Sequence, residues 1–290
     1  MNNTITIGKN TANPLTVPRL GYGTMRLTGE GFYGEPPNRP EALAILKRAI
    51  EKGVRFIDTA DYYGDDVTNR LIAEAIYPYP DDLVICTKVG ATRKPDKSWV
   101  VYNTPENLRT SIENNLRTLK IDRITQVHFR VMPGMTNFEA GMEAMFKMQS
   151  EGKILHVGVS NVTRDELETA MKMGNVVSVE NMYGHGQRTT KQFAHGGTNM
   201  GGEEVLDICE QHNIVMVPFW SLHTADRQDT RLAKVAQKYG ATEAQVNIAW
   251  LLHKSPIMLP IPGTSSLAHF EENLAAADIS LSKDDMAFLE

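Results

Sequence analysis

Short apolar runs rich in β-branched residues alternate along this chain with longer segments of helical periodicity. Counting from Leu20, we find eight strand candidates, each followed by a helical pattern. Parallel strands need a long crossover connection, so this alternation predicts a parallel sheet with helices packed outside it. The candidates after the first lie at residues 55–57, 84–87, 124–127, 154–159, 176–179, 214–217 and 257–261.

Several predicted helices carry their own start and stop signals. Thr104 precedes Pro105, which is the pair expected of an N-cap and a first helical residue. Gly53 follows the periodic segment 42–50 as a C-terminal stop. Capping-box spacing occurs twice, at Thr163 with Glu166 and at Thr242 with Gln245.

The length of 290 residues fits one α/β barrel or two domains of about 150 residues each. No Pro-, Ser- or Gly-rich linker divides the chain near its middle, and the glycine-containing stretch 195–198 is short enough to be a loop. We therefore expect residues 1–290 to form a single domain, a closed (β/α)8 TIM barrel with an N-terminal β-hairpin. The two-domain arrangement is the alternative.

Composition narrows the class of partner. The net charge is −5 and no basic stripe compensates for it, so a nucleic-acid partner is not expected. No apolar run approaches the roughly 20 residues of a membrane span, and residues 1–4 do not resemble a secretory signal. We expect a cytoplasmic protein, a monomer or a weak homo-oligomer. The two cysteines, Cys86 and Cys209, are too few for a disulfide framework or a metal site, and no metal is expected.

Polar side chains follow several of the predicted strands at the point where each strand ends. The active sites of (β/α)8 barrels gather at the carboxyl ends of the strands, so these side chains are expected to converge on one mouth. They are Asp58 and Tyr63 after the second strand, Lys88 after the third, His128 after the fourth, and Ser160 and Asn161 after the fifth. Taken singly, each could have a structural role, such as capping a turn or packing an aromatic ring.

Four of these groups form a coherent chemical set. A tyrosine hydroxyl has an ordinary pKa of about 10, which is too high for efficient proton donation at neutral pH. A neighbouring lysine ammonium lowers that pKa, and a carboxylate beside the lysine keeps it charged. A histidine at the same mouth can donate a hydrogen bond to a carbonyl oxygen as negative charge develops. Together, Asp58, Tyr63, Lys88 and His128 suit protonation of an oxygen while a hydride arrives from a cofactor.

These residues lie in motifs that resemble the aldo-keto reductase superfamily, and the likeness extends from about Leu15 to Leu281. The matching segments are Gly21–Met25, Phe56–Gly64 with Lys88 and His128, Gly158–Asn161, Ile261–Ser265 and Glu272–Asn273. The resemblance implies a catalytic tetrad of Asp58, Tyr63, Lys88 and His128, with Tyr63 as general acid. It also implies reduction of a small carbonyl substrate by NADPH bound across the barrel mouth. The family binds this cofactor without a Rossmann fold, and in agreement the sequence has no Gly-x-Gly-x-x-Gly fingerprint of that fold.

The resemblance also implies a set of cofactor-binding residues. Ser160 and Asn161 would hold the carboxamide, Phe219 would lie under the nicotinamide, and Ser221 and Leu222 would lie along the pyrophosphate. The complete set is Gly23, Thr24, Met25, Asp58, Ser160, Asn161, Glu180, Phe219, Trp220, Ser221, Leu222, Gly263, Thr264, Ser265, His269, Glu272 and Asn273.

Three departures from the family pattern affect cofactor binding. Glu180 stands where the family usually has glutamine, and an ionised glutamate can accept but not donate a hydrogen bond. Phe219 replaces the usual tyrosine and lacks its hydroxyl. Gly263 and His269 stand where many members present a basic pair to the 2′-phosphate of NADP. We predict NADPH preference, because Thr264, Ser265 and backbone amides at a helix start can still bind a phosphate. NADH is expected to compete, because histidine is only partly charged at neutral pH and so discriminates less strongly than arginine.

Within the superfamily, Arg26–Gly29 and Pro260–Ser266 look most like bacterial reductases related to pyridoxal reductase, which suggests a pyridoxal-type substrate. The loop Tyr183–Asn199 could shape a polar substrate pocket or could be a solvated surface loop. Two other functions remain open: a nucleotide-binding interaction module with little turnover, and a Schiff-base aldolase using Lys88.

Overall fold

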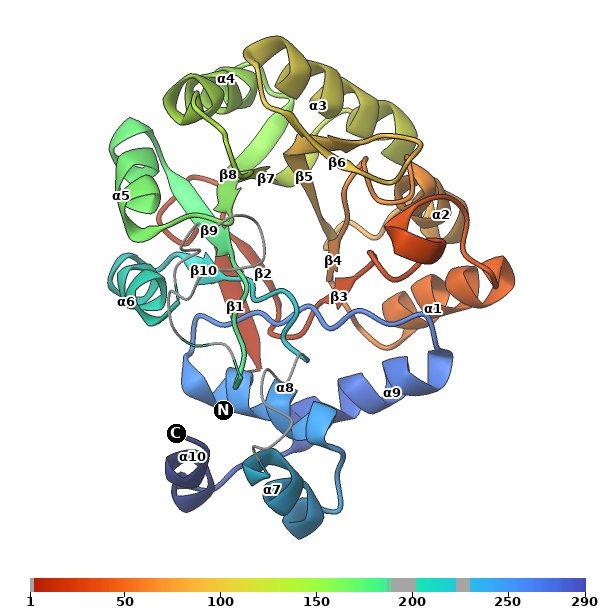
Figure 1. Ribbon diagram of the computed structural model, residues 1–290, viewed down its shortest axis with the longest axis vertical. Helices are drawn as coiled ribbons and strands as arrows, with labels where there is room; N and C mark the ends of the chain where they lie inside the picture. The colour runs from red at the N-terminus through yellow and green to blue at the C-terminus, as the bar shows by residue number, and fades with distance from the viewer. Residues whose placement is uncertain (1–2, 187, 189–201, 223–229) are drawn as a thin grey trace.

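A parallel sheet curls around the centre of the molecule inside a ring of helices (Figure 1). The computed structural model describes residues 3–186, 188, 202–222 and 230–290. Neighbouring strands pair in parallel and in chain order. They are β3 (Tyr22–Gly23), β4 (Phe56–Asp58), β5 (Val84–Arg93), β7 (Ile124–Arg130), β8 (Ile154–Ser160), β9 (Val176–Glu180) and β10 (Val215–Met216).

The eighth predicted strand, 257–261, closes the barrel without forming a regular ladder. Met258 makes an isolated parallel bridge to Met216, and on the other side the Gly21 N–H donates to the Pro260 carbonyl at 2.9 Å. Pro260 and Pro262 lack the N–H that a ladder needs, which explains the irregular pairing. The predicted (β/α)8 barrel is confirmed, and only the regularity of its last strand was wrongly predicted.

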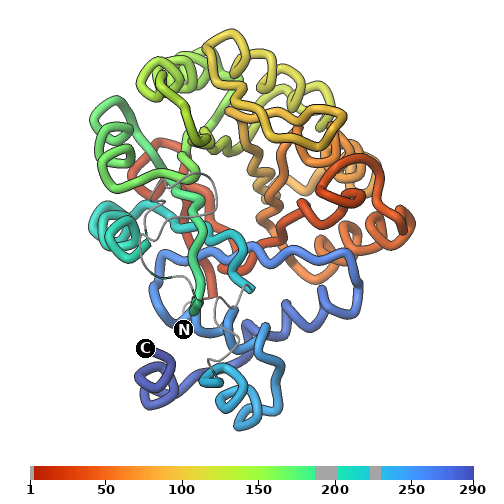
Figure 2. Tube along the Cα trace, viewed as in Figure 1, coloured from red at the N-terminus to blue at the C-terminus, as the bar shows by residue number. Residues whose placement is uncertain are grey.

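The helices lie on the outer surface of the sheet, and Figure 2 traces the same ring as a tube. They are α1 (Arg39–Glu51), α2 (Val67–Ile76), α3 (Pro105–Leu119), α4 (Phe138–Ser150), α5 (Arg164–Met173), α6 (Glu203–His212), α7 (Arg231–Tyr239), α8 (Glu243–Lys254), α9 (Leu267–Ala275) and α10 (Lys283–Leu289), with 3-10 turns η1 (Glu30–Phe32) and η2 (Ala276–Asp278). The predicted Thr104 cap and both predicted capping boxes are present. Within the described ranges, no helix is long and apolar enough to cross a membrane.

An N-terminal hairpin closes the amino end of the barrel. Its strands, β1 (Thr4–Ile7) and β2 (Leu15–Pro18), pair antiparallel. Ile5, Ile7 and Val17 pack against residues from the first halves of the barrel strands, including Phe56 and Val84. Because this hairpin covers the amino end of the barrel, the carboxyl end is the open end at which a site can form.

A second hairpin was not predicted. Strand β5 continues past Lys88 to Arg93 and pairs antiparallel with β6 (Trp99–Tyr102). This extension packs Trp99 against a cluster that includes Tyr62 and Tyr63 at the mouth. The sequence did carry a signal, since Pro95 and Asp96 are turn formers followed by the strand-favouring run 99–102.

Candidate active site

Three of the four tetrad residues come together through strand register. Lys88 on β5 and His128 on β7 are register partners, and Asp58 ends the neighbouring strand β4. The Lys88 ammonium donates to the Asp58 carboxylate and lies 3.4 Å from the Thr59 carbonyl. Asp58, Lys88 and His128 are 3%, 2% and 0% exposed, so this ion pair is shielded from water. Burial of a charged pair costs free energy unless each charge is well partnered.

Tyr63 lies beside this ion pair, in the turn that follows β4. Its ring centre is 5.1 Å from the Lys88 Nζ, and its ring packs edge-on against Tyr62 with centroids 5.3 Å apart. Burial raises the pKa of the Tyr63 hydroxyl above its ordinary value, and the Lys88 charge acts to lower it. The arrangement gives the lysine direct electrostatic influence over the tyrosine proton.

Glu180, at the end of β9, joins the same network. One of its oxygens lies 3.2 Å from the Lys88 Nζ, and the other lies 2.9 Å from the His128 Nδ1. The Lys88 ammonium therefore has two carboxylate partners. Burial acts to lower the pKa of Lys88, but Asp58 and Glu180 together raise it well above its ordinary value. Lys88 thus stays charged even though it is buried.

His128 is held on both sides of its ring. Its Nδ1 contacts Glu180, and its Nε2 lies 2.8 Å from the Ser178 hydroxyl and 3.1 Å from the Gln126 amide nitrogen. Because a carboxylate only accepts hydrogen bonds, we assign a proton to Nδ1. Burial lowers the pKa of His128, which favours the neutral ring.

The residues expected to bind cofactor follow the carboxyl ends of other strands or lie on α9. Gly23–Met25 lie at the end of β3, Ser160–Asn161 at the end of β8, Phe219–Leu222 after β10, and Gly263–Ser265 after the closing segment. His269, Glu272 and Asn273 lie on α9. The side chain of Glu180 is instead turned toward the tetrad, with both oxygens engaged there.

Asn161 carries an unsatisfied acceptor at this edge of the mouth. Its amide nitrogen lies 3.3 Å from the Val131 carbonyl, to which it donates, but its Oδ1 is buried without a hydrogen-bond partner among the described residues. Its backbone adopts φ of +60°, a left-handed conformation that asparagine tolerates better than most residues. A buried acceptor of this kind is costly until a donor such as a carboxamide NH2 arrives.

The comparisons with known proteins agree with this geometry. A family model described as the aldo/keto reductase family matches residues 19–290. The chain belongs to the aldo/keto reductase family. It is 40% identical over 295 residues to a pyridoxine 4-dehydrogenase of Escherichia coli, covering 99% of this chain and 97% of that relative. It is 37% identical over 280 residues to an uncharacterized oxidoreductase of Schizosaccharomyces pombe, covering 95% and 87% of the two chains.

Solved aldo/keto reductase structures superpose over nearly the whole chain. A thermostable aldo-keto reductase in complex with the inhibitor epalrestat has a TM-score of 0.79 and 28% identity, with 99% of this chain and 98% of that chain covered. An aldo/keto reductase from Klebsiella pneumoniae in complex with NADP and acetate has a TM-score of 0.77 and 26% identity, with 100% and 94% covered.

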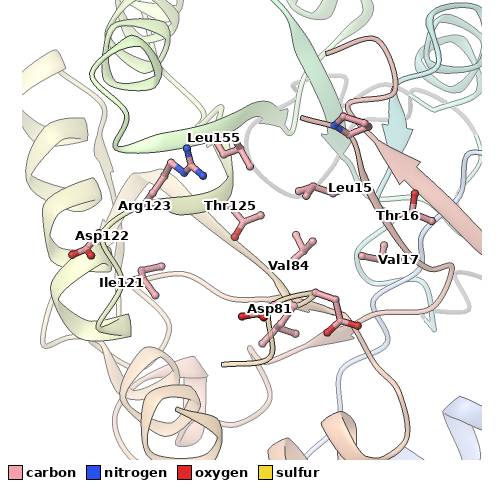
Figure 3. A pocket seen from close by; sticks show the side chains of 13 residues that line it. Leu15, Thr16, Val17, Asp81, Val84, Ile121, Asp122, Arg123, Thr125 and Leu155 are labelled. Carbon is pink, nitrogen blue, oxygen red and sulfur yellow. The ribbon is translucent and has the colours of Figure 1, made fainter. Parts of the chain in front are cut away.

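Other features of this aldo/keto reductase lie away from the mouth. A hollow of about 660 Å³ opens at the amino end of the barrel, between β2 and the first residues of β5, β7 and β8 (Figure 3). Its charged lining residues are Asp81, Asp82, Asp122 and Arg123. None of the predicted site residues lines it, so we assign the chemistry to the opposite end.

Among the described residues, one group of potential metal ligands includes two members of the predicted tetrad. Ligand atoms of Asp58, Cys86 and His128 lie within 4.8 Å of one another. The Asp58 carboxylate already binds the Lys88 ammonium, whose charge would oppose a cation at this point. That the enzyme needs no metal stays a prediction.

The polar loop after β9 is only partly described. Gln187, Lys191 and His195, three of its polar side chains, lie outside the described residues. His185 contacts the Leu289 carbonyl at 2.8 Å, and Arg188 pairs with the Glu290 carboxylate at 2.9 Å. These two side chains therefore bind the C-terminal residues.

Sequence reasoning missed several residues around the aldo/keto reductase tetrad. Gln126 and Ser178 orient His128, while Trp99 and Arg130 line the mouth. Strand alternation could have found two of them, because Gln126 and Arg130 lie two positions either side of His128 and share its face. Nothing in the sequence pattern indicated that Ser178 would reach the His128 ring.

Proposed function

We propose that this aldo/keto reductase is an NADPH-dependent carbonyl reductase that converts an aldehyde or ketone to the alcohol, with Tyr63 as general acid. The observation that carries the proposal is the packing of Tyr63 5.1 Å from a lysine ammonium that two buried carboxylates keep charged. An interaction module that only binds nucleotide has no chemical need for this arrangement.

The chain's own residues divide the work of the reaction. When bound, NADPH supplies the hydride. Tyr63 gives its hydroxyl proton to the carbonyl oxygen, and Lys88 stabilises the phenolate that remains. Asp58 and Glu180 hold Lys88 in place and charged. We assign His128 to orienting the carbonyl oxygen through Nε2, which exchanges its contacts with Ser178 and Gln126 for the substrate. This donation requires the imidazolium, which Glu180 beside Nδ1 stabilises against the burial that lowers its pKa.

The residues at the mouth fit a nicotinamide cofactor. The orphaned Oδ1 of Asn161 suits the carboxamide of the nicotinamide, and the partly buried Phe219 offers an apolar surface. We assign the pyrophosphate to Ser221 and Leu222, and the ribose phosphate to Thr264, Ser265 and His269. The NADP bound by the Klebsiella relative supports NADPH, and NADH is the competing cofactor.

The name of the E. coli relative, pyridoxine 4-dehydrogenase, supports a proposal for the substrate class. We propose a pyridoxal-type aldehyde as the first compound to test. We further propose that residues 1–290 act as one domain in the cytoplasm, as a monomer or weak homo-oligomer, without a nucleic-acid partner. The acidic net charge of −5 supports the last point.

The test is oxidation of NADPH and of NADH, followed at 340 nm, against a panel of carbonyl compounds that includes pyridoxal. Wild-type protein is compared with Tyr63→Phe, which keeps the ring and removes only the proton donor. We expect reduction by the wild type and a loss of about 100-fold or more in kcat for the variant, with NADPH binding retained. Wild-type protein that binds NADPH but reduces no member of the panel would contradict the proposal and favour a nucleotide-binding module.

A further inference from the structure

Arg130 is a cation at the barrel mouth with no acidic partner among the described residues. It ends β7 two residues after His128, so both side chains project from the same face of the strand. The alternate residues Val127 and Phe129 pack in the apolar cluster under the outer helices, which places Arg130 on the inner side. Its Nε is buried and has no hydrogen-bond partner.

The surroundings of Arg130 are aromatic and positively charged. Its guanidinium carbon lies 4.6 Å from the centre of the Trp99 ring and 5.9 Å from that of Tyr62. Arg93 lies 4.4 Å from the same Trp99 ring, and the described residues give it no ion pair either. The Tyr62 hydroxyl is buried without a hydrogen-bond partner. Arg93 donates to the backbone carbonyls of Gly31 and Lys97. Among the described residues, the Arg130 guanidinium and the Tyr62 hydroxyl are therefore the groups here that lack an acceptor anion.

This positive group is close to the proposed general acid. The Tyr62 ring, which faces Arg130, also packs edge-on against Tyr63 with ring centres 5.3 Å apart. The phosphates of the cofactor are assigned to 221–222 and 264–265, on the arc of the barrel across from β5, β6 and β7 (Figure 1). A cofactor phosphate is therefore a poor counter-ion for Arg130, whereas a substrate in front of Tyr63 lies within its surroundings.

We propose that Arg130, with Tyr62, binds a negatively charged oxygen that the substrate carries near its carbonyl group. A guanidinium whose Nε is buried without a partner costs free energy, and a ligand oxyanion removes that cost with charge-assisted hydrogen bonds. This inference rests on the proposed reductase function and narrows its substrates to carbonyl compounds with a carboxylate, phosphate or ring-bound oxyanion. Pyridoxal fits the class, because a hydroxyl that ionises stands on the ring carbon next to the one bearing its aldehyde.

The experiment compares pairs of aldehydes that differ in the charged oxygen. The pairs are 2-carboxybenzaldehyde with its methyl ester, and 3-hydroxypyridine-4-carboxaldehyde with pyridine-4-carboxaldehyde; a phosphorylated arm is pyridoxal 5′-phosphate against pyridoxal. Each is assayed with wild type, Arg130→Met, Arg130→Lys and the control Arg123→Met, which alters an arginine at the amino end of the barrel. The comparison in which Arg130→Met loses most kcat/KM for the charged aldehyde identifies the oxyanion as a carboxylate, a ring-bound oxygen or a phosphate.

In Arg130→Met we expect kcat/KM to fall about 10- to 100-fold for the charged member of at least one pair, mainly through KM. The neutral member should change less than about threefold, Arg130→Lys should recover part of the loss, and Arg123→Met should match wild type. Equal losses for both members, or no loss for either, would overturn the inference. The thermal midpoint of Arg130→Met should change little, because no ion pair is removed and only the contacts with the Trp99 and Tyr62 rings are lost.

A binding arm separates this inference from the proposed function. Benzoate and benzamide are titrated calorimetrically into wild type and Arg130→Met, both saturated with NADP+. Preferential binding of benzoate that is lost in the variant supports the anion site even if no aldehyde is reduced, in which case only the proposed function fails. Equal binding of benzoate by both proteins would overturn the anion site, whether or not the enzyme is active.

Discussion

At the scale of single residues, Glu180 is unusual because its carboxylate contacts both Lys88 and His128. Lys88 thereby gains a second carboxylate in addition to Asp58. The Asp58 and Glu180 carboxylates both act on Lys88, and the Glu180 charge also acts to raise the pKa of Tyr63. We therefore expect Glu180 to affect proton transfer through its contacts with Lys88 and His128. It is a positioning residue whose effect should appear in the pH dependence of the reaction.

We predict that Glu180→Gln moves the basic limb of the reduction profile to lower pH. Reduction needs the protonated Tyr63 hydroxyl and declines as the pH rises through its pKa. Removal of the Glu180 negative charge lowers that pKa, so the decline should begin about 1 pH unit earlier. The measurement is kcat/KM against pH for wild type and variant, with Glu203→Gln on α6 as the matched control. An unchanged limb in Glu180→Gln, or the same shift in both variants, would contradict this role.

The proximity of Asp58, Lys88 and His128 could be predicted from the sequence because each one ends an apolar run, whereas Tyr63 lies in the turn beyond β4 and was identified by its chemistry and by the family motif. The turn of Glu180 toward Lys88 and His128 could not be predicted, since a side-chain rotamer depends on what fills the barrel interior. The same holds for Arg130, whose missing counter-charge becomes visible only when its three-dimensional neighbours are known.

At the scale of elements, Gly158 on β8 leaves room for side chains of the two neighbouring strands, β7 and β9, to contact each other. His128 on β7 and Ser178 on β9 are separated by β8, yet their side chains lie 2.8 Å apart. A Cβ at position 158 would lie 2.5 Å from the His128 Cδ2 and closer still to the Ser178 Oγ. The contact that fixes His128 therefore depends on the absence of a side chain in the intervening strand.

We predict that Gly158→Ala lowers both stability and activity. Overpacking of this kind costs about 1–3 kcal/mol, and displacement of His128 should lower kcat about 10-fold. The control is Ser282→Ala, which removes the capping box of α10 and costs about 1 kcal/mol of unfolding free energy away from the site. Denaturant unfolding and steady-state kinetics separate the two effects. Wild-type kcat in Gly158→Ala would show that the His128–Ser178 contact is dispensable.

Elements with strong local signals were the most predictable. The caps at Thr104, Thr163 and Thr242 are present because a side chain and a backbone N–H only a few residues apart decide them. The β5–β6 hairpin was missed because its first strand, β5, continues an already recognised strand beyond Lys88. The ladder at 257–261 was overestimated because Pro260 within that apolar run and Pro262 directly after it were not weighed.

At the scale of the whole molecule, the N-terminal hairpin closes one end of the barrel and the network of Asp58, Lys88, Glu180 and His128 lies toward the other. The alternation of strand and helix was sufficient to predict this architecture, because it leaves few ways to pair parallel strands. The substrate was beyond prediction from the pattern, since specificity depends on the side chains that surround the mouth.

The central claim is that the chain transfers a hydride to a carbonyl carbon while Tyr63 protonates the oxygen. The most direct test is a single turnover with NADPH deuterated at C4 of the nicotinamide and an aldehyde, followed by mass spectrometry of the alcohol. We predict deuterium on the former carbonyl carbon with wild type, and a transfer slowed about 100-fold or more in Tyr63→Phe at equal NADPH occupancy. No label transfer by NADPH-saturated wild type, or transfer by Tyr63→Phe at the wild-type rate, would contradict the account.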